Sequence, residues 1–124
     1  MYRRLSIKFT NGEYLVMSVV NIRKKELNNR GIDSFADWAA DTNHVYIGRN
    51  MTFYVPGTYK SKWANPFSVQ KYGRDKCLEL YEEYVRGDKD LWDSLDDLEG
   101  CELGCWCAPE ACHGNILLKL LSEK

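Results

Sequence analysis

Alternating apolar and polar residues near the start of the chain predict a β-hairpin. Residues 3–9 (RRLSIKF) alternate, and residues 13–22 (EYLVMSVVNI) are rich in strand-favouring side chains. The turn between them falls at Asn11-Gly12, a pair suited to two-residue hairpin loops. Short apolar runs at 44–49 (HVYIGR) and 101–107 (CELGCWC) predict two further strands.

Helical periodicity appears in the second half of the chain. Residues 74–86, 88–98 and 114–123 each place apolar residues on one helical stripe, and Gly100 stands where a glycine cap would end the second helix. A shorter helix is expected within residues 33–42, capped by Asp33 or Ser34. The predicted inward stripes are Cys77, Leu80, Tyr81 and Tyr84; Leu91, Trp92, Leu95 and Leu98; and Ile116, Leu117, Leu120 and Leu121.

Strands separated by helices predict an α/β fold for residues 1–124 as one small domain. We expect a mixed, mostly parallel sheet with an N-terminal hairpin and flanking helices. Ligands of such sheets bind at the carboxyl ends of the strands. Two loops begin at predicted strand ends, one after Gly48 and one after Cys107, and parallel neighbouring strands would bring them to the same edge.

Composition narrows the cellular setting. The chain has 124 residues, no run of eighteen apolar residues and no secretory-type start, so we expect a soluble, cytoplasmic protein without a membrane partner. Its five cysteines are an odd number, and four of them crowd into the C-terminal third, which favours thiol or metal chemistry in a reducing compartment over disulfides.

Charge is uneven along the chain although the net charge is −1. Residues 1–63 carry ten Lys and Arg against five Asp and Glu, whereas residues 64–124 carry seven against thirteen. Solvated helix faces explain most such imbalances. The pattern permits an anionic ligand near the basic half, and it argues against a broad nucleic-acid surface.

The segment LGCWCAPEACHGN (103–115) joins a predicted strand to the last predicted helix. Strand alternation puts Cys101 and Cys105 on one face, where they are best explained by packing. Cys107 and Cys112 bracket the connecting loop. Cys112 and His113 then stand at the start of a helix, where the positive dipole end lowers a thiol pKa and favours anions.

Two kinds of chemistry fit this segment. In the first, Cys112 or else Cys107 is a nucleophile and His113 carries the proton, while Gly114 lets backbone approach a ligand and Asn115 caps the helix or donates a hydrogen bond. In the second, a zinc ion is bound by Cys105, Cys107, Cys112 and His113. Against zinc, all four candidates lie within nine positions, and adjacent ligands are awkward.

A second informative segment is SKWANPF (61–67), which lies in a long loop rich in Gly, Pro and aromatic residues. Its side chains suit a planar heterocycle with an anionic tail: rings stack, an amide reads polar edges, and a cation or hydroxyl meets phosphate. A structural role for the same residues is the open alternative. The candidate ligand-binding residues are Arg49, Ser61, Lys62, Trp63, Asn65 and Phe67.

These segments together resemble domain-of-unknown-function family 4326. The resemblance rests on VVNIRK, VYIGR, SKWANPF and LGCWCAPEACHGNILLKLL and covers residues 19–121 as a family core, with residues 1–18 as an N-terminal extension. It implies one small domain. It also implies importance for Ser61, Lys62, Trp63, Asn65, Pro66, Phe67, Cys105, Cys107, Pro109, Cys112, His113 and Gly114.

Two positions depart from that family's pattern. Ala64 replaces a usual glycine, and Asn115 replaces a usual aspartate, which puts in doubt any role that needs a charge there. The C-terminal motif is also weakly similar to domain-of-unknown-function family 488, where a comparable motif joins a strand to a helix.

The leading functional hypothesis is a domain that binds a nucleotide-like or other phosphorylated small molecule, with no cofactor. Whether it catalyses a reaction with a Cys/His pair stays open. The alternative is a zinc-binding structural or protein-interaction module without catalysis. The sequence leaves the oligomeric state undetermined.

Overall fold

Four strands form one mixed sheet in the computed structural model, which describes residues 3–8, 14–108 and 110–124. They are β1 (Arg3–Lys8), β2 (Tyr14–Asn21), β3 (His44–Tyr46) and β4 (Glu102–Cys105), in the order β1-β2-β4-β3. β1 and β2 pair antiparallel, and β2, β4 and β3 run parallel to one another. The predicted Asn11-Gly12 turn lies outside the described residues.

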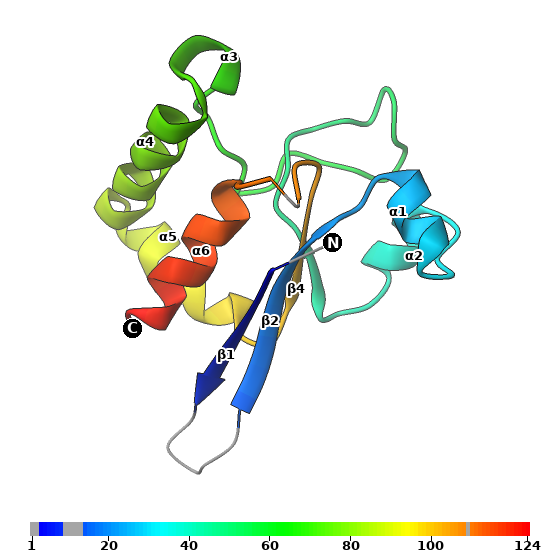
Figure 1. Cartoon of the computed structure of the whole chain (residues 1–124), viewed down its shortest axis with the longest axis horizontal. Coiled ribbons are helices and arrows are strands. Elements are labelled where there is room, and N and C mark those ends of the chain that lie inside the picture. Colours follow the sequence, from blue (N-terminus) through cyan, green and yellow to red (C-terminus); the bar gives the residue numbers. More distant parts are fainter. Residues whose placement is uncertain (1–2, 9–13, 109) are drawn as a thin grey trace.

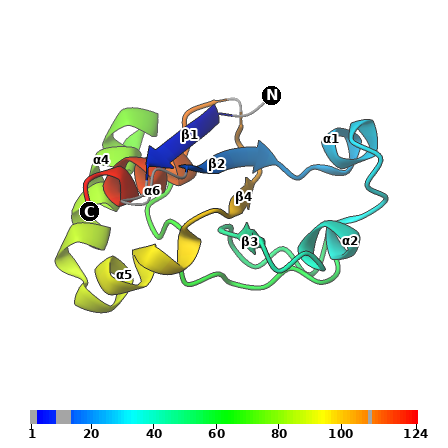
Figure 2. The same cartoon turned by 90° about the horizontal axis from the view of Figure 1, so that it is seen from below.

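Helices cover both faces of this sheet, as Figures 1 and 2 show. One face carries α1 (Lys24–Asn29) and α2 (Phe35–Ala39). The other carries α4 (Arg74–Gly87), α5 (Lys89–Ser94), the 3₁₀ helix η1 (Leu95–Leu98) and α6 (His113–Ser122). The expected α/β fold is therefore confirmed.

The alternation of β4 divides the core into two clusters. Leu103 and Cys105 face the α4–α6 side, where Met17, Val19 and the α6 leucines pack. Gly104 faces the other side, where an added Cβ would lie 2.4 Å from the Trp38 ring. The absent side chain therefore lets Trp38 lie directly against the central strand.

Several elements differ in extent from the sequence prediction. The strand predicted at 101–107 ends at Cys105, so Trp106 and Cys107 already belong to the following loop. The helix predicted at 88–98 divides into α5 and η1, with Gly100 at φ 76° just beyond it. Ser34 caps α2 by accepting the N–H of Asp37, as one of the two predicted caps.

Two short helices were not predicted. α1 buries a single residue, Leu27, so its sequence has no apolar stripe to mark it. α3 (Val69–Tyr72) buries none. Its one clear signal is Ser68, whose Oγ accepts the N–H of Lys71 at 2.9 Å. None of the helices in the described part of the chain is long and apolar enough to cross a membrane.

Candidate functional site

A cleft of ≈ 560 Å³ lies at the carboxyl ends of the three parallel strands, and we call it the central cleft. Each strand is followed directly by residues that line it. Arg23 follows β2, Gly48 and Arg49 follow β3, and Trp106 and Cys107 follow β4. Parallel pairing thus gathers segments that are distant in the sequence at one edge of the sheet, where α/β proteins bind ligands.

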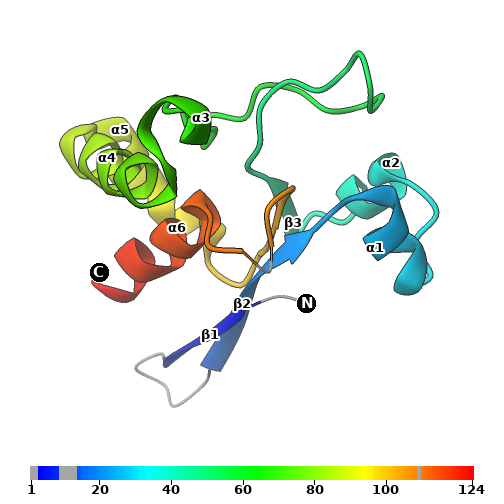
Figure 3. The same cartoon turned by 45° about the horizontal axis from the view of Figure 1, so that its top comes forward.

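The two sequence motifs meet across the central cleft. The SKWANPF loop contributes Asn65, Pro66 and Phe67, and α6 contributes its first residue, His113. In Figure 3 the long loop after β3 and the segment that leads from β4 into α6 approach the same edge of the sheet. The edge placement expected from parallel strands is therefore found.

Positive charge lines the central cleft. Arg23 and Arg49 are exposed, and neither forms an ion pair within the described part of the chain. Among the described residues that line the cleft there is no Asp or Glu. An unpaired guanidinium is a strong, bidentate donor to phosphate or carboxylate, so this edge favours an anion.

His113 is held in a defined tautomer. Its Nε2 lies 2.6 Å from the carbonyl oxygen of Ile47, and because a carbonyl can only accept, Nε2 carries the proton. Nδ1 is then an acceptor, and no described residue donates to it. Burial lowers the pKa of His113, so the ring is neutral at pH 7.

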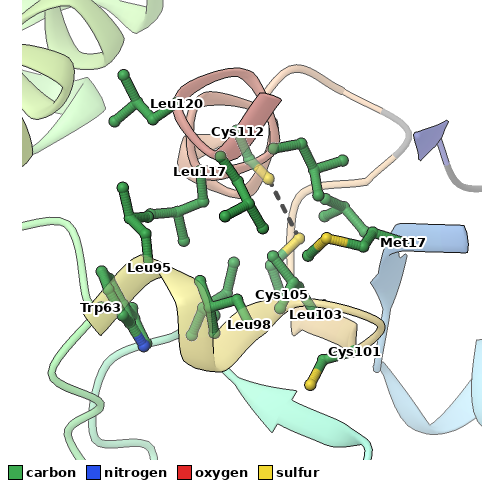
Figure 4. Packing of buried hydrophobic residues seen from close by; sticks show 14 of the residues in the cluster. Met17, Trp63, Leu95, Leu98, Cys101, Leu103, Cys105, Cys112, Leu117 and Leu120 are labelled. Carbon is green, nitrogen blue, oxygen red and sulfur yellow. Dashed lines mark hydrogen bonds between the residues drawn. The ribbon is translucent and has the colours of Figure 1, made fainter. Parts of the chain in front are cut away.

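Cys105 and Cys112 form a buried thiol pair, shown beneath α6 in Figure 4. Their sulfurs are 3.3 Å apart. The hydrogen bond with the Cys112 sulfur, together with the backbone N–H groups of Cys107 and Ala108 that donate to the Cys105 sulfur, lowers the Cys105 pKa to about 7. The pKa of Cys112 is raised because its proton is held between the two sulfurs and because the group is buried.

This finding corrects the expected activation of Cys112. The Cys112 sulfur does accept the N–H of Gly114 at the start of α6, which alone would lower its pKa. The hydrogen bond to Cys105 and the burial outweigh that effect. Cys112 therefore keeps its proton, and its side chain belongs to the core rather than to the cleft.

Cys107 is the accessible member of the cysteine group. The other four cysteines are buried, whereas Cys107 is half-buried and lines the central cleft. Burial raises the pKa of Cys107, so its thiol is protonated at neutral pH. Nearby, Arg74 donates to the carbonyl oxygen of Ala111 at 2.6 Å and to the Glu110 carboxylate at 2.9 Å, which ties α4 to this loop.

Two of the seven residues in the SKWANPF motif are internal. Trp63 is buried in the larger core cluster, and its carbonyl oxygen accepts the Tyr81 hydroxyl at 2.7 Å. Ser61 is also buried, and its Oγ accepts the N–H of Trp63 at 3.1 Å. We therefore assign packing and loop-shaping roles to these two residues, in place of the expected aromatic wall and phosphate contact.

The remaining motif residues divide between two hollows. Asn65 is committed within the loop, since its Oδ1 accepts the N–H of Phe67 and its Nδ2 donates to the Cys77 sulfur at 3.1 Å. Phe67 is half-buried at the cleft wall. Lys62 donates to Ser94 at 3.0 Å and lines a neighbouring hollow of ≈ 730 Å³, where Asp88 and Asp90 also lie.

Gly114 and Asn115 shape the start of α6. An added Cβ on Gly114 would lie 2.8 Å from Val19 and 2.9 Å from Ile47, so this glycine lets the helix rest on the sheet. Asn115 accepts the N–H of Cys112 at 2.9 Å through Oδ1, the capping role expected for it. The uncharged amide of Asn115 makes this capping hydrogen bond, so the cap does not require the aspartate that is usual in the family.

The zinc alternative named Cys105, Cys107, Cys112 and His113. In the part of the chain that the structure describes, no group of three or more His, Cys, Asp or Glu is arranged to hold a metal ion. The Nε2 of His113 is already occupied by Ile47, and the Cys105 and Cys112 sulfurs face one another.

Sequence reasoning missed Arg23 and Trp106 as cleft residues. Arg23 directly follows the strand predicted at 13–22. The rule that ligands bind at the carboxyl ends of parallel strands was therefore sufficient to find it. Trp106 was predicted to lie within the strand 101–107, which in fact ends one residue before it, at Cys105. Its ring lines the cleft, and its Nε1 donates to the Tyr46 hydroxyl at 3.0 Å.

Comparison with known proteins identifies the family and no activity. The family model described as "Domain of unknown function (DUF4326)" matches residues 32–123, beginning later than the expected core start at Val19. "Uncharacterized protein R718" of Acanthamoeba polyphaga mimivirus is 33% identical over 85 residues, which cover 61% of this chain and 65% of that protein. The match therefore spans less than two thirds of the mimivirus protein.

A phage protein is also similar. The "Uncharacterized 12.4 kDa protein in nrdA-td intergenic region" of Enterobacteria phage T4 is 28% identical over 96 residues, which cover 66% of this chain and 87% of that protein. No solved structure matches the chain.

Proposed function

We propose, from the premise that this chain belongs to the domain-of-unknown-function family DUF4326, that it binds a nucleotide-like, phosphorylated small molecule in the central cleft. One observation carries the proposal. Three parallel strands end at this cleft, two unpaired arginines line it, and none of its described lining residues is a carboxylate. In the proposed complex Arg23 and Arg49 hold the phosphate group.

The rest of the cleft supports a ring system beside the anion. Phe67 and Trp106 are half-buried aromatic residues on two of its walls. Rings that are partly exposed in a cleft can stack on a planar heterocycle. Nδ1 of His113 is a fixed acceptor, suited to an N–H or O–H donor of the ligand.

Binding is the function that these contacts support, and catalysis is left outside the proposal. Cys112 is buried with a raised pKa, and the accessible Cys107 also has a raised pKa. A nucleophile works as a thiolate at neutral pH, which neither side chain provides in the unliganded protein. His113 is the one neutral proton acceptor among the described residues that line the cleft.

Thermal shift against nucleoside mono-, di- and triphosphates and sugar phosphates tests the proposal. A ligand at a hundredfold its Kd stabilises the protein by roughly 2.7 kcal/mol. Arg49→Ala and Arg23→Ala should each weaken that stabilisation. Lys89→Ala, an exposed cation on α5 that pairs with Asp93 away from the cleft, is the matched control.

Two results would count against the proposal. One is a panel in which no phosphorylated compound raises the unfolding midpoint. The other is stoichiometric zinc in protein purified without added metal, lost in Cys107→Ser, which would favour the metal-binding alternative.

A further inference from the structure

The long loop between β3 and α3 exposes three aromatic side chains. Phe53, Tyr54 and Tyr59 are 90%, 76% and 53% exposed, and we call them the aromatic platform. Figure 3 shows this loop extending away from the sheet. Apolar rings this exposed cost free energy in water unless a partner covers them, so they mark an interaction surface.

The platform is held by an ordered loop. Thr58 is buried, its hydroxyl donates to the carbonyl oxygen of Val55 at 2.8 Å, and its Oγ accepts the N–H of Met51 at 3.1 Å. The N–H of Tyr54 also donates to the carbonyl oxygen of Met51 at 2.9 Å. The rings are therefore presented by a cross-linked turn, which reduces the entropy lost when a ligand covers them.

Positively charged residues flank the platform along the chain. Between Asp41 and Asp75 the sequence contains five Lys or Arg and no Asp or Glu. Arg49, Lys60 and Lys62 flank the rings along the chain, are exposed, and form no ion pair among the described residues. Exposed rings beside unpaired cations match the two needs of a single nucleic-acid strand, which are base stacking and phosphate neutralisation.

The platform is continuous with the central cleft. Met51, at the base of the turn, lines the cleft. Tyr54 lines a side groove of ≈ 470 Å³, and Trp106 lines both this groove and the cleft. A strand with one base stacked on Tyr54 could therefore continue past Trp106 into the central cleft, where Arg49 lies.

We infer that the chain binds single-stranded nucleic acid, with bases stacked on Phe53, Tyr54 and Tyr59 and one nucleotide of the strand in the central cleft. This inference rests on the proposed function and narrows its ligand to a nucleotide within a strand. It requires no broad basic surface, because the cations are confined to one loop and to Arg23 at the central cleft. The hollow next to Lys62 carries Asp88 and Asp90, so the strand follows the central cleft, whose described lining residues include no carboxylate.

Fluorescence anisotropy with a labelled oligothymidylate and a labelled oligouridylate of about twelve nucleotides tests the inference. The double variant Phe53→Ala/Tyr54→Ala should lose about tenfold or more in affinity for the preferred strand. The double variant Phe53→Leu/Tyr54→Leu keeps apolar area without rings, and it should lose nearly as much. Both substitutions are at exposed positions, so the fold should be retained, which circular dichroism checks.

Salt dependence and free nucleotides complete the experiment. Between about 50 mM and about 200 mM salt, affinity for the strand should fall, with a logarithmic slope of about −0.7 for each phosphate neutralised. Binding of free thymidine and uridine monophosphates, measured by thermal shift, should be unchanged in both platform variants.

The outcomes separate this inference from the proposed function. If free nucleotides bind but the strands bind no tighter, or if the leucine variant keeps full affinity, the platform inference is overturned while the cleft proposal stands. If the strands bind through the platform and no free nucleotide binds, base stacking on the platform is supported, but the placement of a nucleotide in the central cleft is overturned together with the cleft proposal. If neither binds, both are wrong.

Discussion

Two halves of one motif have opposite environments. Cys105 and Cys112 face each other in the core beneath α6, whereas Cys107 and His113, their near neighbours in sequence, line the central cleft. Cys105 also borders the cleft, but it is buried. The division follows from local geometry, because β4 ends at Cys105 and α6 begins at His113. A dense cluster of reactive residue types is therefore better understood as two pairs with different tasks than as one site.

The SKWANPF loop shows the same division. Ser61 and Trp63 are buried and fix the loop to the core, while Pro66 and Phe67 line the cleft. In both motifs the internal residues should govern stability and the cleft residues should govern ligand binding. Substitutions that compare the two classes test this contrast directly.

The largest effect is expected at Trp63. Its side chain is 4% exposed within the larger core cluster, so Trp63→Ala leaves a cavity and should lower the free energy of unfolding by about 3–5 kcal/mol. Phe67→Ala, at the half-buried cleft wall, should cost clearly less. Urea denaturation of both variants measures the difference. Equal losses would contradict the division of the motif.

A second core effect is expected at Gly114. Because an added Cβ would lie 2.8 Å from Val19 and 2.9 Å from Ile47, Gly114→Ala should destabilise the protein by about 1–3 kcal/mol. Gly87→Ala, in the last turn of α4, is the matched control, since nothing lies within 4 Å of its added Cβ. If both variants unfold at the wild-type urea concentration, α6 is not closely seated on the sheet.

Most core residues could be predicted from the sequence, because the buried residues of a helix or strand recur at a regular spacing along the chain. Leu95, Leu98, Leu117 and Leu120 were all predicted to face inward, and all are buried. Tyr84 was also predicted to face inward, but it is exposed. Periodicity did not predict α1, because this helix buries a single residue, Leu27. Periodicity also overestimated the length of β4, because the alternation of cysteines continues to Cys107, two residues past the last strand residue.

The site was less predictable because loop residues obey no period. Trp63 and Phe67 have the same kind of side chain in one loop, yet one is internal and the other faces the cleft. The environment of Cys112 depends on Cys105, and this contact requires the placement of α6 over β4. One rule applied to the sequence did locate the site: ligands bind at the carboxyl ends of parallel strands. This rule predicted that the SKWANPF loop and the cysteine-histidine segment would meet.

A smaller, pH-dependent effect is expected at His113. Burial lowers the pKa of the folded-state ring below its ordinary value of 6.5, so the unfolded chain takes up a proton more readily than the folded chain. The stabilising contribution is complete above pH 6.5 and is lost as the pH falls toward the lowered pKa. His113→Gln removes the titrating group and should flatten the urea-denaturation profile between pH 7 and pH 5.

The test is the difference between the wild-type and His113→Gln profiles, because other titrating groups are common to both. A difference that is constant with pH would show that His113 titrates alike in the folded and unfolded states. The hydrogen bond from Nε2 to Ile47 should be partly replaced by the glutamine amide, so stability at pH 7 should change less than in Trp63→Ala.

The smallest change in stability is expected at Cys107. It is the half-buried cysteine among four buried ones, so Cys107→Ser should alter the free energy of unfolding by only about 0.5 kcal/mol. Cys112→Ser should cost more, because it places a more polar hydroxyl group in the core beside the Cys105 sulfur. Native-state alkylation gives an independent measurement of the same contrast.

Iodoacetamide should modify one site in the folded wild-type protein, Cys107, and none in Cys107→Ser. The reaction should accelerate as the pH rises, because burial raises the Cys107 pKa and only the thiolate reacts. Faster labelling of Cys105 than of Cys107 at neutral pH would mean that the sulfur with the lower pKa is reachable from solvent. The two halves of the motif would then share one accessible site, since Cys105 borders the central cleft and only its burial, at 1% exposed, keeps it from solvent.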